Sequence, residues 1–264
     1  HSLADISRVH SRLTPQRPAL AFEGRTTTYQ QLDARASQVA QGLIALGVRP
    51  GDRVAHLGKN TDFYLELLLG AAKAGAVMTP VNWRLAPREL QIVLDNAQPG
   101  ALIVDASFVP VIEEMRAALP FVRHFIGFDG ASAGFESYEA MLAEASTAPP
   151  DVAVSPEDTA CLLYTSGTTG IPKGAELIHR SLLLNCDAAI REMFEYTDND
   201  VTLAPMPFFH VGGMWYHLFP SFAAGCTTVI MPQFDPQGVL ELMARHRVTN
   251  THLVPTMIHT LLEQ

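Results

Sequence analysis

Helical periodicity alternates with short apolar runs along the first 145 residues. Apolar positions recur at helical spacing from Leu32 to Leu46, and Thr28 with Gln31 forms the pattern of a capping box before them. We expect Gly47 to end this helix. Further helices are predicted over residues 61–74, 87–96, 108–119 and 138–145. Apolar runs bounded by Gly, Pro or Asp predict strands at residues 52–58, 77–82, 101–105 and 121–128.

The same alternation resumes after residues 146–159, which concentrate Pro, Ser, Thr and Asp as a surface linker does. Strands are predicted at residues 160–166, 174–180, 201–207, 227–232 and 248–255. Helices are predicted to begin at Ser181 and Thr256 and to span residues 212–224 and 236–247. Such alternation favours an α/β fold with parallel or mixed sheets covered on both faces. Placing the main boundary at the linker predicts one α/β subdomain at residues 1–150 and a second α/β portion at 151–264.

Composition and charge narrow the classes of protein. The chain has 264 residues, 48% of them hydrophobic, and a net charge of -9, so we expect a folded protein that does not bind nucleic acid broadly. The apolar tract at residues 65–81 contains Glu66 and Lys73, which argues against membrane insertion, and the polar N-terminus does not resemble a secretory signal. The cysteines are widely spaced, which predicts neither disulfides nor a cysteine zinc site. We therefore expect a cytoplasmic location. The three cysteines are Cys161, Cys186 and Cys226.

The most informative stretch is TSGTTGIPKG, residues 165–174. Its glycines let backbone N–H groups turn inward and its hydroxyls add donors, so the loop can wrap an oligophosphate, with Lys173 supplying compensating charge. The P-loop template does not fit, because Pro172 precedes the lysine and a strand follows. The bland alternative is a flexible surface turn followed by a solvated lysine.

This run resembles, nearly residue for residue, the phosphate-binding signature of the adenylate-forming superfamily, which contains acyl-CoA synthetases, luciferases and the adenylation domains of peptide synthetases. Other segments resemble further family motifs in the expected order: TYQQL, ALGVRPGDRVA, GAAKAGAV and PVNWRL upstream, PMPFFHVGG and VPTM downstream. The resemblance covers essentially the whole chain and is closest to the AMP-forming acyl-CoA synthetases. It implies the N-terminal region of such an enzyme, with stacked αβαβα subdomains and mixed sheets.

The resemblance also implies an activity. Family members form an acyl-adenylate and pyrophosphate from a carboxylic acid and MgATP, then pass the acyl group to a thiol such as that of coenzyme A. The residues that would hold the ATP phosphates are Thr165, Ser166, Gly167, Thr168, Thr169, Gly170 and Lys173. Mg²⁺ is expected to arrive with ATP, since the histidines form no HExxH or Cys/His set that would hold a metal.

His210 is the implied catalytic residue, and its expected role is to position the acyl carboxylate rather than to act as an acid or base. A lone histidine beside apolar residues is more often structural, so that alternative stays open. The implied acid-binding residues are His210, Val211, Gly212, Gly213 and Met214. Trp215 would border the same pocket, although a Met and aromatic stripe is commonly plain core.

The family's later motifs are missing from this sequence: the adenine-binding region, the ribose-binding Asp, the hinge and the C-terminal catalytic Lys. We therefore expect an N-terminal part of a ligase for fatty or aromatic acids, inactive alone. Two alternatives remain: a noncatalytic module that binds a nucleotide or acyl group, and an amino-acid adenylation domain. A homodimer also stays open.

Overall fold

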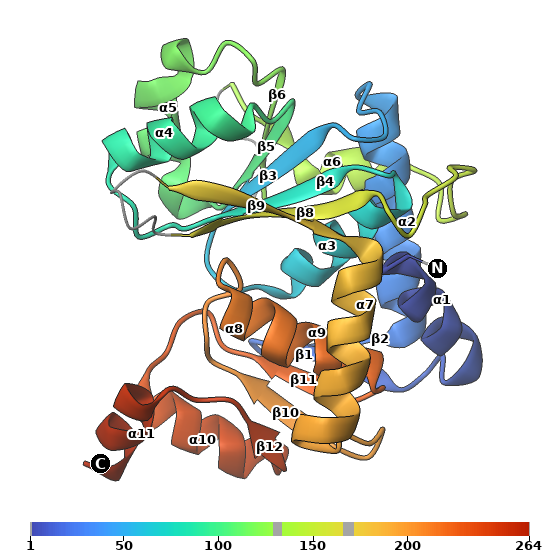
Figure 1. Cartoon of the computed structure of the whole chain (residues 1–264), viewed down its shortest axis with the longest axis vertical. Coiled ribbons are helices and arrows are strands. Elements are labelled where there is room, and N and C mark those ends of the chain that lie inside the picture. The colour runs from blue at the N-terminus through green and yellow to red at the C-terminus, as the bar shows by residue number, and fades with distance from the viewer. Residues whose placement is uncertain (1, 129–133, 166–171, 264) are drawn as a thin grey trace. The chain divides into compact units, whose positions relative to one another are not determined.

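The computed structural model describes residues 2–128, 134–165 and 172–263 (Figure 1). Contacts divide the chain into two compact units, each built from more than one stretch of sequence. Unit 1 comprises His1–Ala4, Ala34–Gly58 and Glu66–Arg180, and unit 2 comprises Asp5–Asp33, Lys59–Leu65 and Ser181–Gln264. The linker at residues 146–159 falls inside unit 1. A domain boundary near residue 150 stays a prediction.

Among the described residues, unit 1 holds a seven-stranded mixed sheet in the order β7-β6-β5-β3-β4-β8-β9. Neighbours are parallel except β8 and β9, which pair antiparallel. Because β3, β4, β5 and β8 run in one direction, their carboxyl ends share one edge of the sheet. The strands are β3 (Arg53–Leu57), β4 (Val77–Val81), β5 (Ala101–Val104), β6 (His124–Gly127), β7 (Glu136–Ser137), β8 (Thr159–Thr165) and β9 (Lys173–Ile178).

The helices of unit 1 cover both faces of this sheet. The chain crosses one way from β3 to β4 and the other way from β4 to β5, so right-handed crossovers put the intervening helices on opposite faces (Figure 1). Leu90 and Ile112 of the helices α4 and α5 belong to one buried cluster with Leu57 and Leu102 of the sheet. The helices with a part in unit 1 are α2 (Tyr29–Ala45), α3 (Asp62–Lys73), α4 (Pro87–Ala97), α5 (Val109–Met115) and α6 (Tyr138–Ala143).

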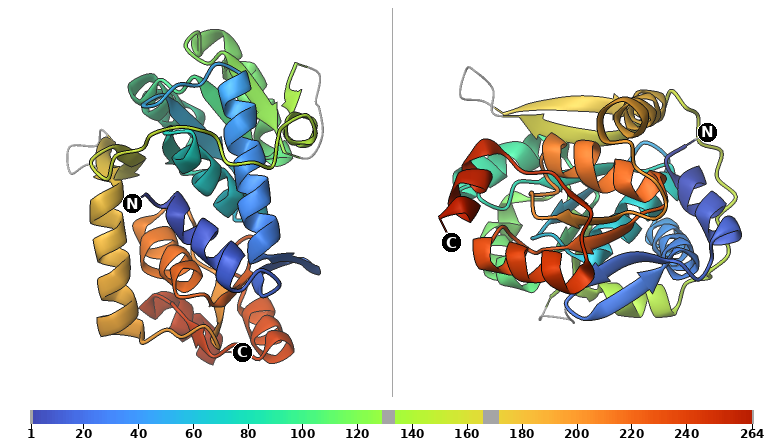
Figure 2. Two further views of the ribbon diagram at one scale, coloured as in Figure 1. Left: turned by 90° about the vertical axis from the view of Figure 1, so that its right-hand side faces the viewer. Right: turned by 90° about the horizontal axis from the view of Figure 1, so that it is seen from below.

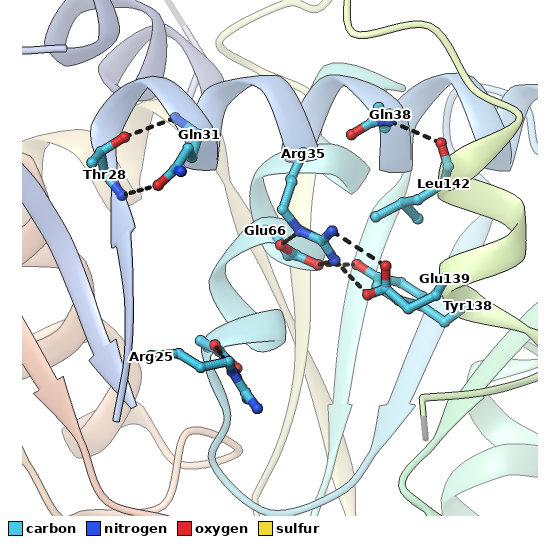
Figure 3. A network of polar contacts seen from close by, with 10 residues as sticks. Arg25, Thr28, Gln31, Arg35, Gln38, Glu66, Tyr138, Glu139 and Leu142 are labelled. Carbon is cyan, nitrogen blue, oxygen red and sulfur yellow. Dashed lines mark hydrogen bonds and ion pairs between the residues drawn. The ribbon is translucent and has the colours of Figure 1, made fainter. Parts of the chain in front are cut away.

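A buried ion pair joins the helices α2, α3 and α6 within unit 1 (Figure 3). The Arg35 guanidinium donates to Glu66 at 2.9 Å and to Glu139 at 2.6 Å, and the Tyr138 hydroxyl donates to Glu66 at 2.9 Å. Burial raises the pKa of the Glu66 carboxyl, and the Arg35 charge opposes that shift. The contacts satisfy a carboxylate that is 3% exposed.

In the described part of unit 2, a five-stranded mixed sheet has the order β12-β10-β11-β1-β2. Its neighbours are parallel except β1 and β2. The crossovers from β10 to β11 and from β11 to β12 run in opposite directions, which places α9 and α10 on opposite faces (Figures 1 and 2). The strands are β1 (Pro18–Phe22), β2 (Arg25–Thr28), β10 (Val201–Ala204), β11 (Thr227–Ile230) and β12 (Asn250–Thr251).

Helices α10 and α9 pack in unit 2 through buried apolar side chains. Val239 of α10 lies in one cluster with Leu203 and Val229 of the sheet, and Phe222 of α9 stacks on Tyr29 at 5.6 Å. The helical elements with a part in this unit are α1 (Ala4–Leu13), α7 (His179–Ala188), the π-helical turns η3 (Ala189–Phe194) and η4 (Met214–Leu218), α8 (Val211–Gly213), α9 (Phe219–Ala223), α10 (Pro236–His246) and α11 (Pro255–Leu262).

The structure confirms most predicted elements and corrects a few. The capping box is present: the Thr28 N–H donates to Gln31 at 2.8 Å, and the Gln31 N–H donates to the Thr28 hydroxyl at 3.2 Å. The predicted strand at 248–255 shrinks to Asn250–Thr251, because helix α11 already begins at Pro255. The helix predicted at 212–224 is divided by the turn η4. Helix α1 and the hairpin of β1 and β2 were not predicted at all.

A search of the described residues finds no helix long and apolar enough to cross a membrane.

Candidate functional site

The two flanks of the phosphate-loop motif meet at the end of a hairpin in unit 1. Thr165 is the last residue of β8, Lys173 is the first of β9, and the two are register partners. Ser166, Gly167, Thr168, Thr169 and Gly170 lie outside the described residues. The motif leaves the sheet at the carboxyl edge, because β8 runs parallel to β4.

The position of this hairpin matters because β4, next to β8, and β3, the strand beyond it, send their connections to opposite faces of the sheet. In open α/β sheets, ligands bind outside the carboxyl ends of strands at such a switch point. Tyr164 anchors the hairpin to helix α4, since its hydroxyl donates to Asn96 at 2.6 Å. The Lys173 side chain is exposed.

His210 stands in unit 2 on the segment that follows the carboxyl end of β10. It precedes α8, and its Nδ1 atom accepts a hydrogen bond from the Gly212 N–H at 3.2 Å. A neutral imidazole that accepts at Nδ1 carries its proton on Nε2. The residue is exposed, so Nε2–H is a donor that a ligand can reach.

The two glycines after His210 differ in what their backbones contact. A Cβ atom on Gly213 would lie 2.2 Å from the Pro207 carbonyl oxygen, which is backbone. At Gly212 it would meet the flexible end of Met206 at 3.2 Å. Only Gly213 therefore requires the absence of a side chain, because the chain folds back on itself there.

The remaining predicted acid-binding residues differ in their exposure to solvent. Val211 is 37% exposed, whereas Met214 is fully buried and Trp215 is 3% exposed. The Trp215 ring lies against Phe219 at 5.3 Å between centroids. An acyl-pocket role for these residues stays a prediction.

One pocket of about 280 Å³ lies away from the predicted site. Its lining includes Arg53, Val77 and Thr159, the first residues of β3, β4 and β8. These residues stand at the amino edge of the unit 1 sheet, whereas the phosphate-loop motif leaves from the carboxyl edge. We therefore give this pocket no part in nucleotide binding.

Asn60 and Tyr64 contact the His210 segment although sequence reasoning assigned neither to the site. The Tyr64 hydroxyl donates to the Phe208 carbonyl at 3.0 Å, and the Phe208 N–H donates to the Asn60 amide oxygen at 2.9 Å. Asn60 lies just before α3 and Tyr64 lies in its first turn, about 145 residues earlier in the chain. Asn60 lies five residues beyond the family-like motif ALGVRPGDRVA, but no periodicity signalled a contact at that separation.

Comparisons with known proteins agree with the motifs. Residues 8–264 match the family described as AMP-binding enzyme. The chain is 37% identical to the fatty acid–[acyl-carrier-protein] ligase ScoC of Streptomyces coeruleorubidus, over 100% of this chain and 50% of that protein. It is also 37% identical to the indoleacetate–CoA ligase of Aromatoleum aromaticum, over 96% of this chain and 49% of that protein.

The fold is shared with a solved structure. The inhibitor-bound N-terminal domain of FACL13 from Mycobacterium tuberculosis superposes with a TM-score of 0.92 at 32% identity, covering 100% of this chain and 65% of that chain. The chain thus spans about half the length of the curated relatives it matches. It belongs to the AMP-binding enzyme family, as the resemblance of its motifs to the adenylate-forming enzymes implied.

Proposed function

We propose that this chain is the N-terminal part of an acid–thiol ligase that activates a carboxylic acid with ATP and transfers the acyl group to coenzyme A. In the first step an acid oxygen bonds to the α-phosphorus of ATP, and the bond from that phosphorus to pyrophosphate breaks. In the second step the thiol displaces AMP. The activity is assigned to a protein of the relatives' length, and we expect residues 1–264 alone to be inactive.

The observation that carries the proposal is the place of Thr165 and Lys173, the two described flanks of the phosphate-loop motif. Thr165 ends β8 at the carboxyl edge of the unit 1 sheet, beside its switch point, and Lys173 pairs with it from β9. Backbone N–H groups and hydroxyls of residues 165–170 would hold the β- and γ-phosphates, and the Lys173 ammonium would offset charge on the departing pyrophosphate.

His210 would orient the acid in this reaction. Its Nε2–H can donate to a carboxylate oxygen, because Nδ1 is occupied by the Gly212 N–H. Such a donor offsets the negative charge of the carboxylate without any proton transfer. Val211, Gly212, Gly213 and Met214 would border the acyl group.

Mg²⁺ would enter with ATP in this proposal. No three His, Cys, Asp or Glu side chains of the described residues lie together where they could hold a metal ion. We assign no residue to Mg²⁺ and expect it to neutralise phosphate charge.

The acid and the acceptor are proposed from the relatives. The named relatives act on a fatty acid and on indoleacetate, so we propose a fatty or aromatic acid. One relative transfers to acyl-carrier protein and the other to CoA at equal identity, which makes carrier protein the competing acceptor. Cys161, Cys186 and Cys226 are buried thiols, which supports the proposed cytoplasmic location. A homodimer stays a prediction.

Mass spectrometry on the longest natural polypeptide that contains residues 1–264 tests the proposal. The protein is given MgATP, a panel of fatty, aromatic and amino acids, and either coenzyme A or holo acyl-carrier protein. We expect an acyl-AMP and an acyl-CoA. Thr168→Ala with Lys173→Ala should lower adenylation at least about 100-fold, because phosphate-loop donors and a cation are removed together.

A matched control removes one exposed hydroxyl and one exposed cation elsewhere: Thr26→Ala with Arg12→Ala. This control should keep full activity. Nucleotide binding without any acyl-AMP across the panel would favour the noncatalytic module. An amino-acyl adenylate alone would favour the adenylation-domain alternative, and unchanged pyrophosphate release in the Thr168/Lys173 variant would remove the phosphate-loop assignment.

A further inference from the structure

The segment that carries His210 is held by side chains from a distant part of unit 2. Asn60 lies just before helix α3 and is 2% exposed. Its amide nitrogen donates to the Met206 carbonyl at 2.9 Å and to the Met231 carbonyl at 3.1 Å. Its amide oxygen accepts from the Phe208 N–H at 2.9 Å. One side chain thus satisfies three buried backbone groups.

These three groups lie at the carboxyl ends of two adjacent strands. Met206 and Phe208 follow β10, and Met231 follows β11. The strands send their connections to opposite faces of the unit 2 sheet, so Asn60 bridges the switch point of that sheet. The Met231 N–H donates to the Ala204 carbonyl at 3.3 Å, and beyond that bond Asn60 joins the two diverging loops.

Tyr64, in the first turn of α3, contacts the same segment. Its hydroxyl donates to the Phe208 carbonyl at 3.0 Å and lies 2.7 Å from the Met214 sulfur. The side chain is 1% exposed, and its ring lies 5.1 Å from that of Phe208. Both backbone groups of Phe208 are therefore hydrogen-bonded, its N–H to Asn60 and its carbonyl to Tyr64.

Phe208 lies two residues before His210, which is exposed. Two backbone hydrogen bonds of the His210 segment are local: the His210 N–H donates to the Pro207 carbonyl at 3.2 Å and the Met214 N–H to the His210 carbonyl at 3.1 Å. The position of the imidazole thus depends on where Phe208 and Met214 are anchored. Asn60, just before α3, and Tyr64, in its first turn, supply these anchors.

We propose that Asn60 and Tyr64 are positioning residues that set the location of His210 for the acid-activating step. The inference rests on the proposed function, in which His210 orients the acyl carboxylate. Loss of either anchor lets the segment shift while the fold persists. A displacement of about 1 Å at a positioning group lowers the rate by up to about 100-fold.

Tyr64→Phe in the longest natural polypeptide is the first test, because it removes the hydroxyl and keeps the buried ring. We expect kcat/KM for the acid in pyrophosphate formation to fall by about 10-fold or more, with KM for ATP unchanged. Asn60→Asp keeps the acceptor for the Phe208 N–H but turns an oxygen toward two carbonyls, so its effect should be larger.

The matched control is Tyr138→Phe, which removes another buried tyrosine hydroxyl with a hydrogen bond, in unit 1. We expect this control to lose stability and keep the kinetics. The decisive comparison repeats Tyr64→Phe in a His210→Ala background. If Tyr64 acts through His210, the hydroxyl loss has no further kinetic effect there.

A full additional loss in the His210→Ala background, or an equal loss in Tyr138→Phe, overturns the inference. Histidine ring NMR separates it from the proposed function. The His210 ring signal should shift in Tyr64→Phe and not in Tyr138→Phe, whatever the reaction is. An unmoved signal rejects the positioning role, whereas a moved signal with unchanged adenylation in His210→Ala rejects the role of His210 instead.

Discussion

At the scale of single residues, backbone contacts decide which parts of the His210 segment tolerate change. Gly212 and Gly213 are equivalent in the sequence, yet only Gly213 faces a carbonyl oxygen at a distance that excludes a Cβ atom. The role of Asn60 likewise depends on its position in the fold. Its type is ordinary for a surface turn, but here it is buried and satisfies three backbone groups.

Gly213→Ala should distort the segment, because the added Cβ would lie 2.2 Å from the Pro207 carbonyl oxygen. We expect the free energy of unfolding to fall by about 2–3 kcal/mol, measured by urea denaturation. Gly212→Ala is the matched control and should cost less than about 1 kcal/mol, since the end of Met206 can move aside. Equal losses in the two variants would contradict the fold of this segment.

At the scale of elements, the Arg35 network shows how α2, α3 and α6 are joined inside unit 1. Helical periodicity predicted all three helices but not their neighbours. The Glu66 carboxylate is buried and is paired with Arg35, while Glu139 at the surface completes the guanidinium contacts (Figure 3). An acidic residue in an apolar helix thereby becomes part of the core.

Arg35→Met should destabilise unit 1 strongly, because it leaves the Glu66 carboxylate buried without its cation. We expect a loss of about 3–5 kcal/mol in the free energy of unfolding. Arg35→Met with Glu66→Leu should lose less than Arg35→Met alone, because no unpaired charge remains. Arg191→Met is the control: its pair with Asp187 is exposed, and its loss should cost at most about 0.5 kcal/mol.

One result would contradict the expected pairing of Arg35 with Glu66. If the double variant is as unstable as the sum of the Arg35→Met and Glu66→Leu variants, the two residues do not act as a pair. Urea denaturation of all four forms closes the cycle.

At the scale of the whole molecule, buried histidines link folding to pH in both units. Burial lowers the pKa of His56 in unit 1 to about 4, with Asp105 opposing the shift. Burial lowers the pKa of His217 in unit 2 to about 3, and His252 adds to the shift. Both folded-state values lie below the value of 6.5 for an unperturbed histidine.

Stability should therefore fall on acidification. Above about pH 6.5 both rings are neutral in the folded and unfolded states, and between that pH and the folded-state pKa only the unfolded chain takes up the proton. Each histidine should contribute about 1 kcal/mol of lost stability per pH unit between pH 6 and 4.5.

Urea denaturation across this pH range measures the slope. His217→Phe should reduce this slope by about the contribution of one bound proton, whatever the effect of the substitution on stability at pH 7. An unchanged slope in His217→Phe would show that this ring is not held neutral in the folded state.

The sequence by itself determined the local elements and the family. Periodicity and the Thr28–Gln31 capping box come from nearest-neighbour chemistry, which a linear pattern records, and the phosphate-loop motif is contiguous. The sequence did not predict the elements whose hydrophobic patterns are weak. Helix α1 lies in a polar stretch, and the turn η4 interrupts an otherwise regular helical pattern.

Only the tertiary structure decided strand order, the edge from which each motif leaves and the partners of buried polar groups. Pairing β1 with β11 joins residues about 200 positions apart, and Tyr64 reaches Phe208 over 144 positions. These contacts depend on crossover direction and packing of the whole unit rather than on spacing along the chain. A pattern of neighbouring residues carries no record of which distant backbone group an amide or hydroxyl will meet.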